Sequence, residues 1–373
     1  MQEESTFDIV IIGGGLAGLT CALALVDYCK VLLVEKESFP NHKVCGEYVS
    51  NEVLPYLQSL GVDPLQHGAK QINTLEISTH TGAVVKSNLP LGGFGMSRYA
   101  LDMLLYKAVS DRCTIVQDTI TEISFVDEMF RVNAKNGDVF SAPHVVGAYG
   151  KRSNLDKLLN RKFIQEKSPW LAVKAHYTYD FDDTKVALHN FNGGYCGLSK
   201  VETNAVNACY LTTYASFKKS NSIVQFQNET MSANPHLAHF FKDAVPLFSE
   251  PLTISQISFN TKQPVENHMF MIGDTAGLIH PLCGNGMAMA IHSAKLFSEL
   301  YLAHKKQKQS RDALELNYSR AWQENFSRRL QTGRRIQNVL LRPSLAKAAF
   351  TTARMFPSLV PEVIKKTHGT ILV

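Results

Sequence analysis

The chain has 373 residues, which is long enough for two interleaved subdomains. Hydrophobic residues make up 45% of it and charged residues 19%, as is typical of a globular protein, and no run of about 18 apolar residues occurs that would predict a membrane-spanning helix. The seven cysteines form no C-x-x-C pair, which argues against a zinc site or a disulfide framework, and the acidic residues 1–6 are unlike a signal peptide. These features predict a cytoplasmic protein.

The net charge of +5 is distributed unevenly along the chain. Residues 304–373 hold 14 Lys and Arg against 4 Asp and Glu, whereas residues 1–303 hold 24 against 29. A basic C-terminal segment that follows an acidic stretch could bind an anionic membrane or an anionic substrate, or it could simply form the solvent-exposed face of a helix. A nucleic-acid partner is not expected, because the sequence has no recognised nucleic-acid-binding fold and no interleaving of aromatic with basic residues.

The first 35 residues have the pattern of a βαβ unit. Apolar, β-branched runs at residues 7–12 and 31–34 predict two parallel strands that are buried on both faces. Residues 16–26 are rich in Ala and Leu and predict the helix between them. Residues 13–18 read GGGLAG, a G-x-G-x-x-G motif that joins the first strand to this helix.

Each glycine of this motif has a physical role in binding a dinucleotide. Gly13 permits a tight turn, Gly15 lets the backbone approach a pyrophosphate, and Gly18 lets the helix pack closely on the strand. The free amides and partial positive charge of the helix N-terminus favour phosphate. Glu35 ends the second strand, where a carboxylate accepts the adenosine ribose hydroxyls, and we include the adjacent Lys36 among the cofactor-binding residues. The alternative is a chance loop followed by a surface glutamate.

The middle of the chain predicts a different kind of structure. Residues 70–95 and 171–260 alternate between apolar and polar positions, which indicates antiparallel strands. Between these stretches, Arg98–Ser110 has a helical pattern. Residues 114–140 predict short strands with a hairpin turn at Asn136-Gly137.

A second glycine-rich turn follows a buried strand predicted at Val265–Ile272, and the pattern is mainly helical from about residue 285 onward. The turn carries a G-D-x-A-G-x-x-x-P-x-x-G-N-G motif, made by Gly273, Asp274, Gly277, Pro281, Gly284, Asn285 and Gly286. It resembles the second flavin motif of the p-hydroxybenzoate hydroxylase-like flavoproteins. The resemblance implies a non-covalent FAD, with Asp274 hydrogen-bonded to the ribityl chain and the turn at Gly284–Met287 beside the flavin pyrimidine edge. The alternative is an ordinary strand–turn–helix with Asp274 as a cap.

Residues 39–47 (FPNHKVCGE) resemble the P-x-x-K-x-C-G segment of the geranylgeranyl reductase branch, which is related to menaquinone-tail reductases and some flavin halogenases. In that branch the segment runs beside the isoalloxazine ring. The resemblance therefore implies that Lys43, Cys45 and Gly46 contact the cofactor, and it makes Cys45 a candidate catalytic residue. The alternative for Cys45 is a small buried hydrophobe.

Residues 97–105 resemble the family's R-x-x-L-D-x-x-L helix, in which the arginine contacts the cofactor diphosphate. We therefore expect Arg98 to bind cofactor, Ser97 to cap the helix, and Asp102 to be a structural acid on the surface.

Two segments depart from the family patterns. Residues 147–153 (GAYGKRS) match a G-A-D-G-x-x-S motif, but Tyr149 replaces the aspartate, which puts a standard NAD(P)H contact in doubt and leaves Lys151 and Arg152 to meet a phosphate. Residues 194–200 lie where prenyl reductases carry G-Y-x-W-x-F-P, and only the first two positions match. Tyr195 is thus a candidate catalytic residue facing the substrate, or only a strand aromatic.

Together these patterns predict an α/β fold with a Rossmann-like (glutathione-reductase-like) FAD-binding domain, an inserted antiparallel β-sheet substrate domain and a C-terminal helical region. The predicted ranges are 1–70, 96–165 and 262–300 for the first, 71–95 and 166–261 for the second, and 301–373 for the third. No metal is expected, because His280 and His292 have no partner at metal-ligand spacing.

The resemblance implies an FAD-dependent oxidoreductase that reduces a carbon–carbon double bond of an apolar isoprenoid or polyene-like substrate, with NAD(P)H or another reductant as electron donor. The alternatives are a monooxygenase that hydroxylates an aromatic or polyene substrate, and a flavin-bound, non-catalytic partner of a carrier protein. A halogenase is disfavoured, because its W-x-W-x-I-P signature is missing at Trp170. Residues 344–360 have an apolar face with Lys347 and Arg354 beside it, which predicts either peripheral membrane contact or a helix that closes the cavity.

Overall fold

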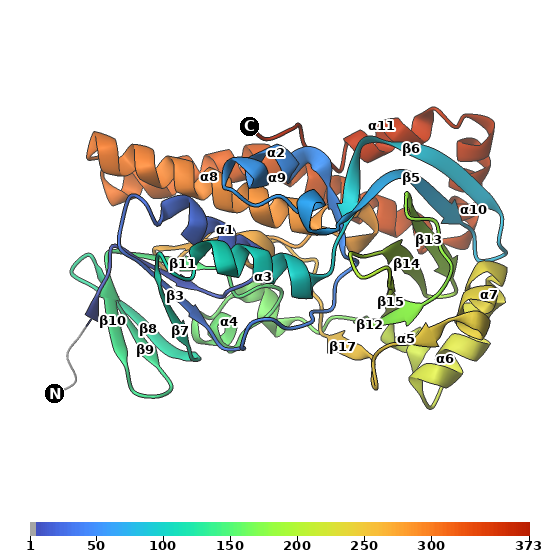
Figure 1. Cartoon of the computed structure of the whole chain (residues 1–373), viewed down its shortest axis with the longest axis horizontal. Coiled ribbons are helices and arrows are strands. Elements are labelled where there is room, and N and C mark those ends of the chain that lie inside the picture. Colours follow the sequence, from blue (N-terminus) through green and yellow to red (C-terminus); the bar gives the residue numbers. More distant parts are fainter. Residues whose placement is uncertain (1–4) are drawn as a thin grey trace.

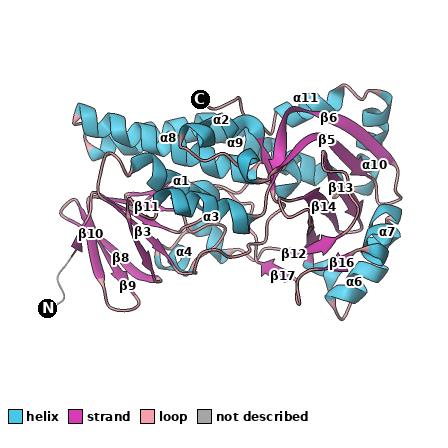
Figure 2. Ribbon diagram, viewed as in Figure 1, coloured by secondary structure: helices cyan, strands magenta, loops and turns pink. Residues whose placement is uncertain are grey.

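The computed structural model describes residues 5–373, apart from the side chain of Pro343, so the first four residues of the predicted 1–70 segment lie outside the described part. The molecule is elongated, with two sheets at one end, a larger strongly curved sheet at the other, and long helices running along one side (Figure 1). Figure 2 shows strands at both ends of the molecule and long helices along one side.

A mostly parallel sheet forms the centre of the first part, in the order β18-β19-β11-β2-β3-β7. Its strands are β2 (Ile9–Ile12), β3 (Val31–Glu35), β7 (Thr114–Gln117), β11 (His144–Gly147), β18 (Val265–Glu266) and β19 (Met269–Met271). Helix α1 (Leu16–Leu25) connects β2 to β3, which pair in parallel, so the predicted βαβ unit is confirmed. Every residue of β2 and β3 is buried, as continuous apolar strands require.

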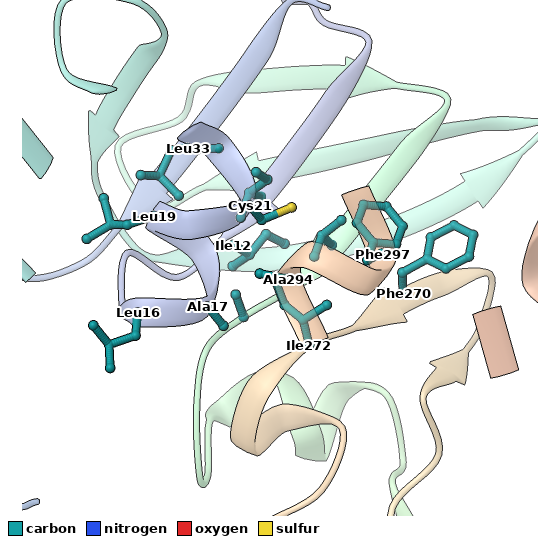
Figure 3. Close-up of a cluster of buried hydrophobic side chains, with 14 of the residues drawn as sticks. Ile12, Leu16, Ala17, Leu19, Cys21, Leu33, Phe270, Ile272, Ala294 and Phe297 are labelled. Atoms are coloured by element: carbon teal, nitrogen blue, oxygen red, sulfur yellow. The ribbon is translucent and has the colours of Figure 1, made fainter. Parts of the chain in front are cut away.

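The core of this part lies between the sheet and two helices. In Figure 3, Ile12 and Phe270 of the sheet face Ala17 of α1 and Ala294 and Phe297 of α8 (Gly286–Gln307). Small residues on α1 let the two helices approach closely over the sheet. This packing fixes the ends of both glycine-rich motifs relative to each other.

A smaller sheet lies beside it, in the order β1-β10-β9-β8. Its strands are β1 (Ser5–Thr6), β8 (Ile120–Val126), β9 (Met129–Ala134) and β10 (Val139–Ala142). The predicted turn at Asn136-Gly137 is confirmed: it joins β9 to β10, and Gly137 has φ of 100°. The single strand predicted at Val265–Ile272 is wrong, because Asn267 and His268 adopt φ of 50° and 63° and fold it into the short β18–β19 hairpin.

The larger sheet runs in the order β16-β12-β15-β14-β13-β5-β6-β4, with β17 beside β12. Its strands are β4 (Tyr48–Ser50), β5 (Lys70–Ser78), β6 (Val84–Gly95), β12 (Trp170–Thr178), β13 (Lys185–Phe191), β14 (Gly194–Lys200), β15 (Val206–Thr213), β16 (Val245–Pro246) and β17 (Leu252–Ser255). Most neighbours are antiparallel, as predicted. β5 and β13 pair in parallel, because the long segment between them returns to the first part of the molecule.

The prediction of strands throughout residues 171–260 is wrong for one stretch, which is helical. It contains α5 (Tyr214–Phe217), α6 (Ile223–Glu229) and α7 (Pro235–Asp243). Each helix begins after a residue whose side chain accepts a hydrogen bond from the first turn: Thr213, Ser222 and Asn234. Pro235 at the first turn of α7 is a further start signal.

The remaining elements are mainly helices, as predicted from residue 286 onward. They are α2 (Leu54–Ser59), α3 (Arg98–Val109), α4 (Asn154–Leu158), α9 (Arg311–Leu340), α10 (Pro343–Met355) and α11 (Leu359–Lys365). Short 3-10 turns lie at Asn51–Val53, Leu65–His67, Lys162–Gln165, Met231–Ala233, Gly273–Thr275 and Pro281–Cys283. Among the described residues, no helix combines the length and apolar character needed to cross a membrane.

Candidate active site

The turn between β2 and α1 requires glycine at two positions. Gly13 has φ of +113°, and a Cβ atom there would lie 2.5 Å from the carbonyl oxygen of Ala148. A Cβ atom on Gly18 would lie 1.9 Å from the carbonyl oxygen of Gly13. These contacts make α1 begin directly after β2, with its N-terminus at the carboxyl end of the parallel sheet.

Glu35 is held in the same turn. Its Oε2 accepts a hydrogen bond from the amide of Gly14 at 2.5 Å, and its Oε1 accepts one from the amide of Glu37 at 3.0 Å. Each oxygen keeps a lone pair for a further donor, such as a ribose hydroxyl. Lys36 lies on the surface, where its Nζ is 3.4 Å from the Glu37 carboxylate, and the structure does not bring it into the site.

A charged cluster lies over Gly15. Asp102 accepts two hydrogen bonds from Arg98, from Nε and Nη2, each at 2.8 Å, and a third from Lys43 Nζ at 2.8 Å. Arg98 Nη2 would be 3.4 Å from a Cβ atom on Gly15. The cluster carries one net positive charge beside the helix N-terminus, which suits a diphosphate.

The structure corrects one expectation about this cluster. Asp102 is not a surface acid: its side chain is 1% exposed. Burial raises its pKa, but Arg98 and Lys43 together hold the pKa below its usual value, so the carboxylate stays ionised. Lys43 donates to Asp102 and does not line the central cavity, and its predicted contact with the cofactor stays a prediction. Ser97 caps α3 as predicted, with its Oγ 3.0 Å from the Ala100 amide.

The second glycine-rich motif lies beside the first, where a Cβ atom on Gly273 would be 2.9 Å from the Cβ atom of Ala17. Gly273 has φ of +61°, and its amide donates to Ser293 Oγ at 2.7 Å, which ties the turn to α8. Gly284 has φ of +64° and lies against Tyr48. The side chain of Asn285 donates to Glu52 at 3.2 Å, while its Oδ1 atom is buried without a hydrogen-bond partner in the described part of the chain. A bound group with a donor would satisfy that atom.

The loop at residues 42–47 is fixed through its carbonyl groups. Four successive carbonyl oxygens each accept a hydrogen bond from a different side chain: Lys43 from Lys174 (3.2 Å), Val44 from Lys151 (3.0 Å), Cys45 from Asn207 (3.2 Å) and Gly46 from Ser199 (3.3 Å). Three of these donors come from the larger sheet. On the other side, a Cβ atom on Gly46 would have no neighbour within 4 Å, so the loop presents an open face to the cavity.

Glu47 anchors the end of this loop and is a residue that the sequence analysis missed. Its side chain is fully buried and accepts hydrogen bonds from Lys174, from His176 Nε2 at 2.6 Å, and from the Arg98 amide at 2.7 Å. Burial raises the pKa of Glu47, but His176 and Lys174 hold it below its usual value. Lys174 and His176 lie two positions apart on the otherwise apolar strand β12, so their side chains point to the same face of the sheet. This pair of basic residues in a buried strand was the sequence signal that a buried acid lies opposite.

His42, Glu47 and His176 place one ligand atom each within 4.8 Å of one another, which is a possible metal geometry. The Lys174 ammonium already binds the Glu47 carboxylate and repels a second cation there. We therefore interpret this cluster as an ion-pair network that holds the 42–47 loop.

Tyr149, the departure from the family motif, turns away from the cavity. Its hydroxyl lies 3.6 Å from Met271 Sδ, and burial raises its pKa. Lys151 lines the cavity and donates to Val44, whereas Arg152 is exposed. Of the two basic residues in this segment, only Lys151 therefore lies where it could contact a ligand in the cavity.

A cavity of about 600 Å³ connects these elements. Predicted site residues that line it are Gly15, Cys45, Gly46, Arg98, Tyr195, Gly273, Asp274, Pro281, Gly284, Gly286 and Met287. Those that do not are Gly13, Gly18, Glu35, Lys36, Lys43, Gly277 and Asn285. Gly277 instead packs on α9, where a Cβ atom would lie 2.8 Å from the Trp322 ring.

Beyond the motifs the cavity wall is mainly apolar, with Thr352, Thr367 and His368 as polar exceptions. The larger sheet contributes Leu75, Ile77, Val85, Leu89, Val186 and Leu188, and the C-terminal helices contribute Ile336, Leu340, Phe350, Val360 and Ile364. Tyr195 lines the cavity and packs beside Leu211 and Leu278, and burial raises its pKa well above the usual range. A phenol in this place stays protonated and is available as a donor.

Comparison with known proteins agrees with this geometry. The family model described as an FAD binding domain matches residues 6–323, so the chain belongs to this family of p-hydroxybenzoate hydroxylase-like FAD-dependent oxidoreductases. It is 22% identical to conditioned medium factor receptor 1 of Dictyostelium discoideum (83% of this chain, 68% of that one) and 20% identical to menaquinone reductase of Mycobacterium tuberculosis (80% and 78%).

The fold is also found in a solved structure. The flavin-dependent brominase Bmp2 is 19% identical, with a TM-score of 0.79 over 97% of this chain and 93% of that one. The glycine turns, the cationic cluster at Gly15 and the unpartnered Asn285 Oδ1 atom fit FAD, and the predicted fold class and FAD cofactor are confirmed.

Proposed function

We propose that the protein reduces a carbon–carbon double bond of a long apolar isoprenoid or polyene-like substrate. The observation that carries this proposal is the division of the cavity: the two glycine motifs and the 42–47 loop line one region, and mainly apolar side chains line the rest. A substrate with many polar groups would lose its hydrogen bonds to water in such a chamber, whereas a hydrocarbon chain gains by burial. The similarity to a menaquinone reductase supports the same substrate class.

The residues have distinct roles in this proposal. When bound, reduced FAD would supply hydride equivalents for a double bond. Arg98 and the α1 N-terminus would hold its diphosphate, and the loop anchored through its carbonyl groups would present Cys45 and Gly46 to it. The Tyr195 hydroxyl donates a proton to one carbon of that bond and is reprotonated from solvent. NAD(P)H or another reductant supplies the electrons, and a contact to it through Lys151 replaces the one that Tyr149 cannot make.

The free cysteines are consistent with a reducing cytoplasm as the site of action, which remains part of this proposal.

Anaerobic turnover tests the proposed reaction. The purified protein is reduced with dithionite under argon and mixed with polyene and isoprenoid acceptors, and the return of oxidised flavin absorbance is followed. Substrate-dependent reoxidation without oxygen is the expected result. Reoxidation that needs both oxygen and substrate would instead assign a monooxygenase. Failure of NADH, NADPH and ferredoxin to reduce the flavin, together with no reaction toward any acceptor, would assign a non-catalytic flavoprotein.

A further inference from the structure

Residues 341–366, which contain α10 and α11 and are here called the C-terminal strap, cover the apolar end of the cavity, where partly buried Ile364 packs against the core. Among the described side chains of α10 and α11, none is buried. By contrast, α9 just before the strap buries Trp322, Phe326 and Leu330. Figure 1 shows the strap in red over the outer end of β6, at the far side of the molecule from the parallel sheet.

The strap is held at both of its ends. On the C-terminal side, the amide of Gly369 donates to Glu52 Oε2 at 2.5 Å, and the amide of Leu372 donates to the Glu52 carbonyl at 2.7 Å. Arg329, on α9 before the strap, donates to the same carboxylate at 3.1 Å. The flanking chain on both sides of the strap is therefore fixed on one buried acid.

The inner and outer faces of the strap are both apolar. Phe350, Val360 and Ile364 line the cavity. Large apolar side chains are also exposed on the strap, namely Leu341 (44%), Leu345 (42%), Met355 (67%), Phe356 (55%), Leu359 (47%) and Val363 (44%). Leu359 and Val363 line the cavity and are also exposed to solvent. The rim of the cavity therefore reaches the surface at α11. Such a concentration of exposed apolar side chains marks an interaction surface.

The charges of the strap indicate what covers it. Its basic residues are Arg342, Lys347, Arg354, Lys365 and Lys366, and its one acidic residue, Glu362, pairs with Lys365 at 2.7 Å. An apolar surface with an excess of lysine and arginine matches an anionic lipid bilayer, in which aliphatic side chains enter the acyl region and basic side chains meet the headgroups. A second copy of the same surface would bring like charges together.

We propose that the C-terminal strap docks on an anionic lipid bilayer and that the apolar substrate enters the cavity from the bilayer at the Leu359–Val363 rim. The docking stands on the exposed side chains and charges alone. The route of entry rests on the proposed function, since it assumes an apolar substrate. The strap is then both the membrane contact and the wall of the substrate chamber.

Flotation of the FAD-loaded full chain with vesicles tests the docking without any turnover. Phosphatidylcholine vesicles are compared with vesicles that also contain phosphatidylglycerol, and the protein is expected to float with the second kind and to be released by high salt. Changing both Met355→Asp and Phe356→Asp removes the apolar contact, and we expect at least a tenfold loss of vesicle binding. Val224→Asp, at a side chain that is 63% exposed on α6, is the matched control and should float like the wild type.

A charge series separates electrostatic from apolar binding. Lys347→Glu and Arg354→Glu should each weaken binding to anionic vesicles by about fivefold, since each basic group contributes near an anionic surface. The proposal is overturned if the wild type fails to bind anionic vesicles, or if the control loses binding as strongly as the strap variants. Concentration-dependent dimerisation in sedimentation that the double variant abolishes, without vesicle binding, would assign the surface to a second copy. Because no substrate is present, these outcomes do not depend on the proposed reductase activity.

Discussion

Arg98 and Asp102 form a two-pronged ion pair one helical turn apart, with Nε and Nη2 of the guanidinium each 2.8 Å from a carboxylate oxygen. The pair places a fixed cation at Gly15, in front of the first turn of α1. Because Asp102 is buried, the guanidinium cannot lose this partner without leaving a charge uncompensated in a low-dielectric site.

Asp102→Asn should therefore both destabilise the protein and weaken FAD binding. Breaking a buried ion pair from one side costs about 3–5 kcal/mol, and Lys43 loses its partner in the same variant. Urea unfolding and the FAD content after gel filtration measure the two effects. A variant with wild-type stability and full FAD content would show that Arg98 is held by something other than Asp102.

Two glycine substitutions should separate cofactor binding from folding. Gly15→Val places its side chain toward the diphosphate position, where only Arg98 Nη2 lies within 4 Å, so the protein should fold but lose FAD. Gly18→Val drives a Cβ atom to 1.9 Å from the Gly13 carbonyl and should yield little folded protein. Circular dichroism and the flavin absorbance distinguish these results. A yellow Gly15→Val protein with full FAD content would contradict the proposal that residues 13–18 bind the cofactor diphosphate.

The Glu47 network should make stability depend on acid. The pKa of Glu47 in the folded protein lies below the 4.5 that is usual for a free glutamate, so its contribution to the free energy of unfolding is complete above about pH 4.5 and is lost as the pH falls through the lower, folded pKa. In Glu47→Gln this part of the acid dependence should disappear, along with several kcal/mol of stability at neutral pH, because Lys174 is left buried without its partner. Urea titrations from pH 3 to about pH 7 measure both. An unchanged pH slope in the variant would assign the acid sensitivity to other carboxylates.

The two candidate catalytic residues should differ in what they change. Tyr195→Phe should keep FAD and lower kcat by about a hundredfold, because it removes a protonated donor from the cavity. Tyr177→Phe, at a buried tyrosine of the same sheet that does not line the cavity, is the control and should leave kcat unchanged. Cys45→Ser should also keep FAD, since the Cys45 carbonyl rather than the thiol anchors the loop. Rapid-mixing kinetics with each loaded variant give the rates, and a Tyr195→Phe enzyme with the wild-type kcat would remove Tyr195 from the mechanism.

The parts of the fold that could be predicted are those whose signal is local. Gly13, Gly15 and Gly18 lie within six residues, and the apolar runs on either side define their strands without distant information. The β18–β19 hairpin was missed because two left-handed residues, Asn267 and His268, interrupt an otherwise continuous apolar pattern. The helices after Thr213 and Asn234 were missed although both caps are visible in the sequence.

The candidate site was predictable only in part, because its other residues are far apart in the sequence and come together only in the folded protein. Glu47 binds Lys174 and His176, which are 127 and 129 positions away, and no spacing rule connects a loop to a strand at that separation. The burial of Asp102 was likewise hidden, since an acid on a helix that begins at Arg98 usually faces solvent. Arg98 itself was found through its local motif.

The most direct test of the proposed reaction is the mass of the product from a single anaerobic turnover. Dithionite-reduced protein is mixed under argon with an isoprenoid polyene acceptor, and the organic extract is examined by mass spectrometry. Double-bond reduction predicts a product heavier by two hydrogen atoms, formed in proportion to the flavin that is reoxidised. A substrate that stays unchanged under argon and gains one oxygen atom only when air is admitted would contradict it.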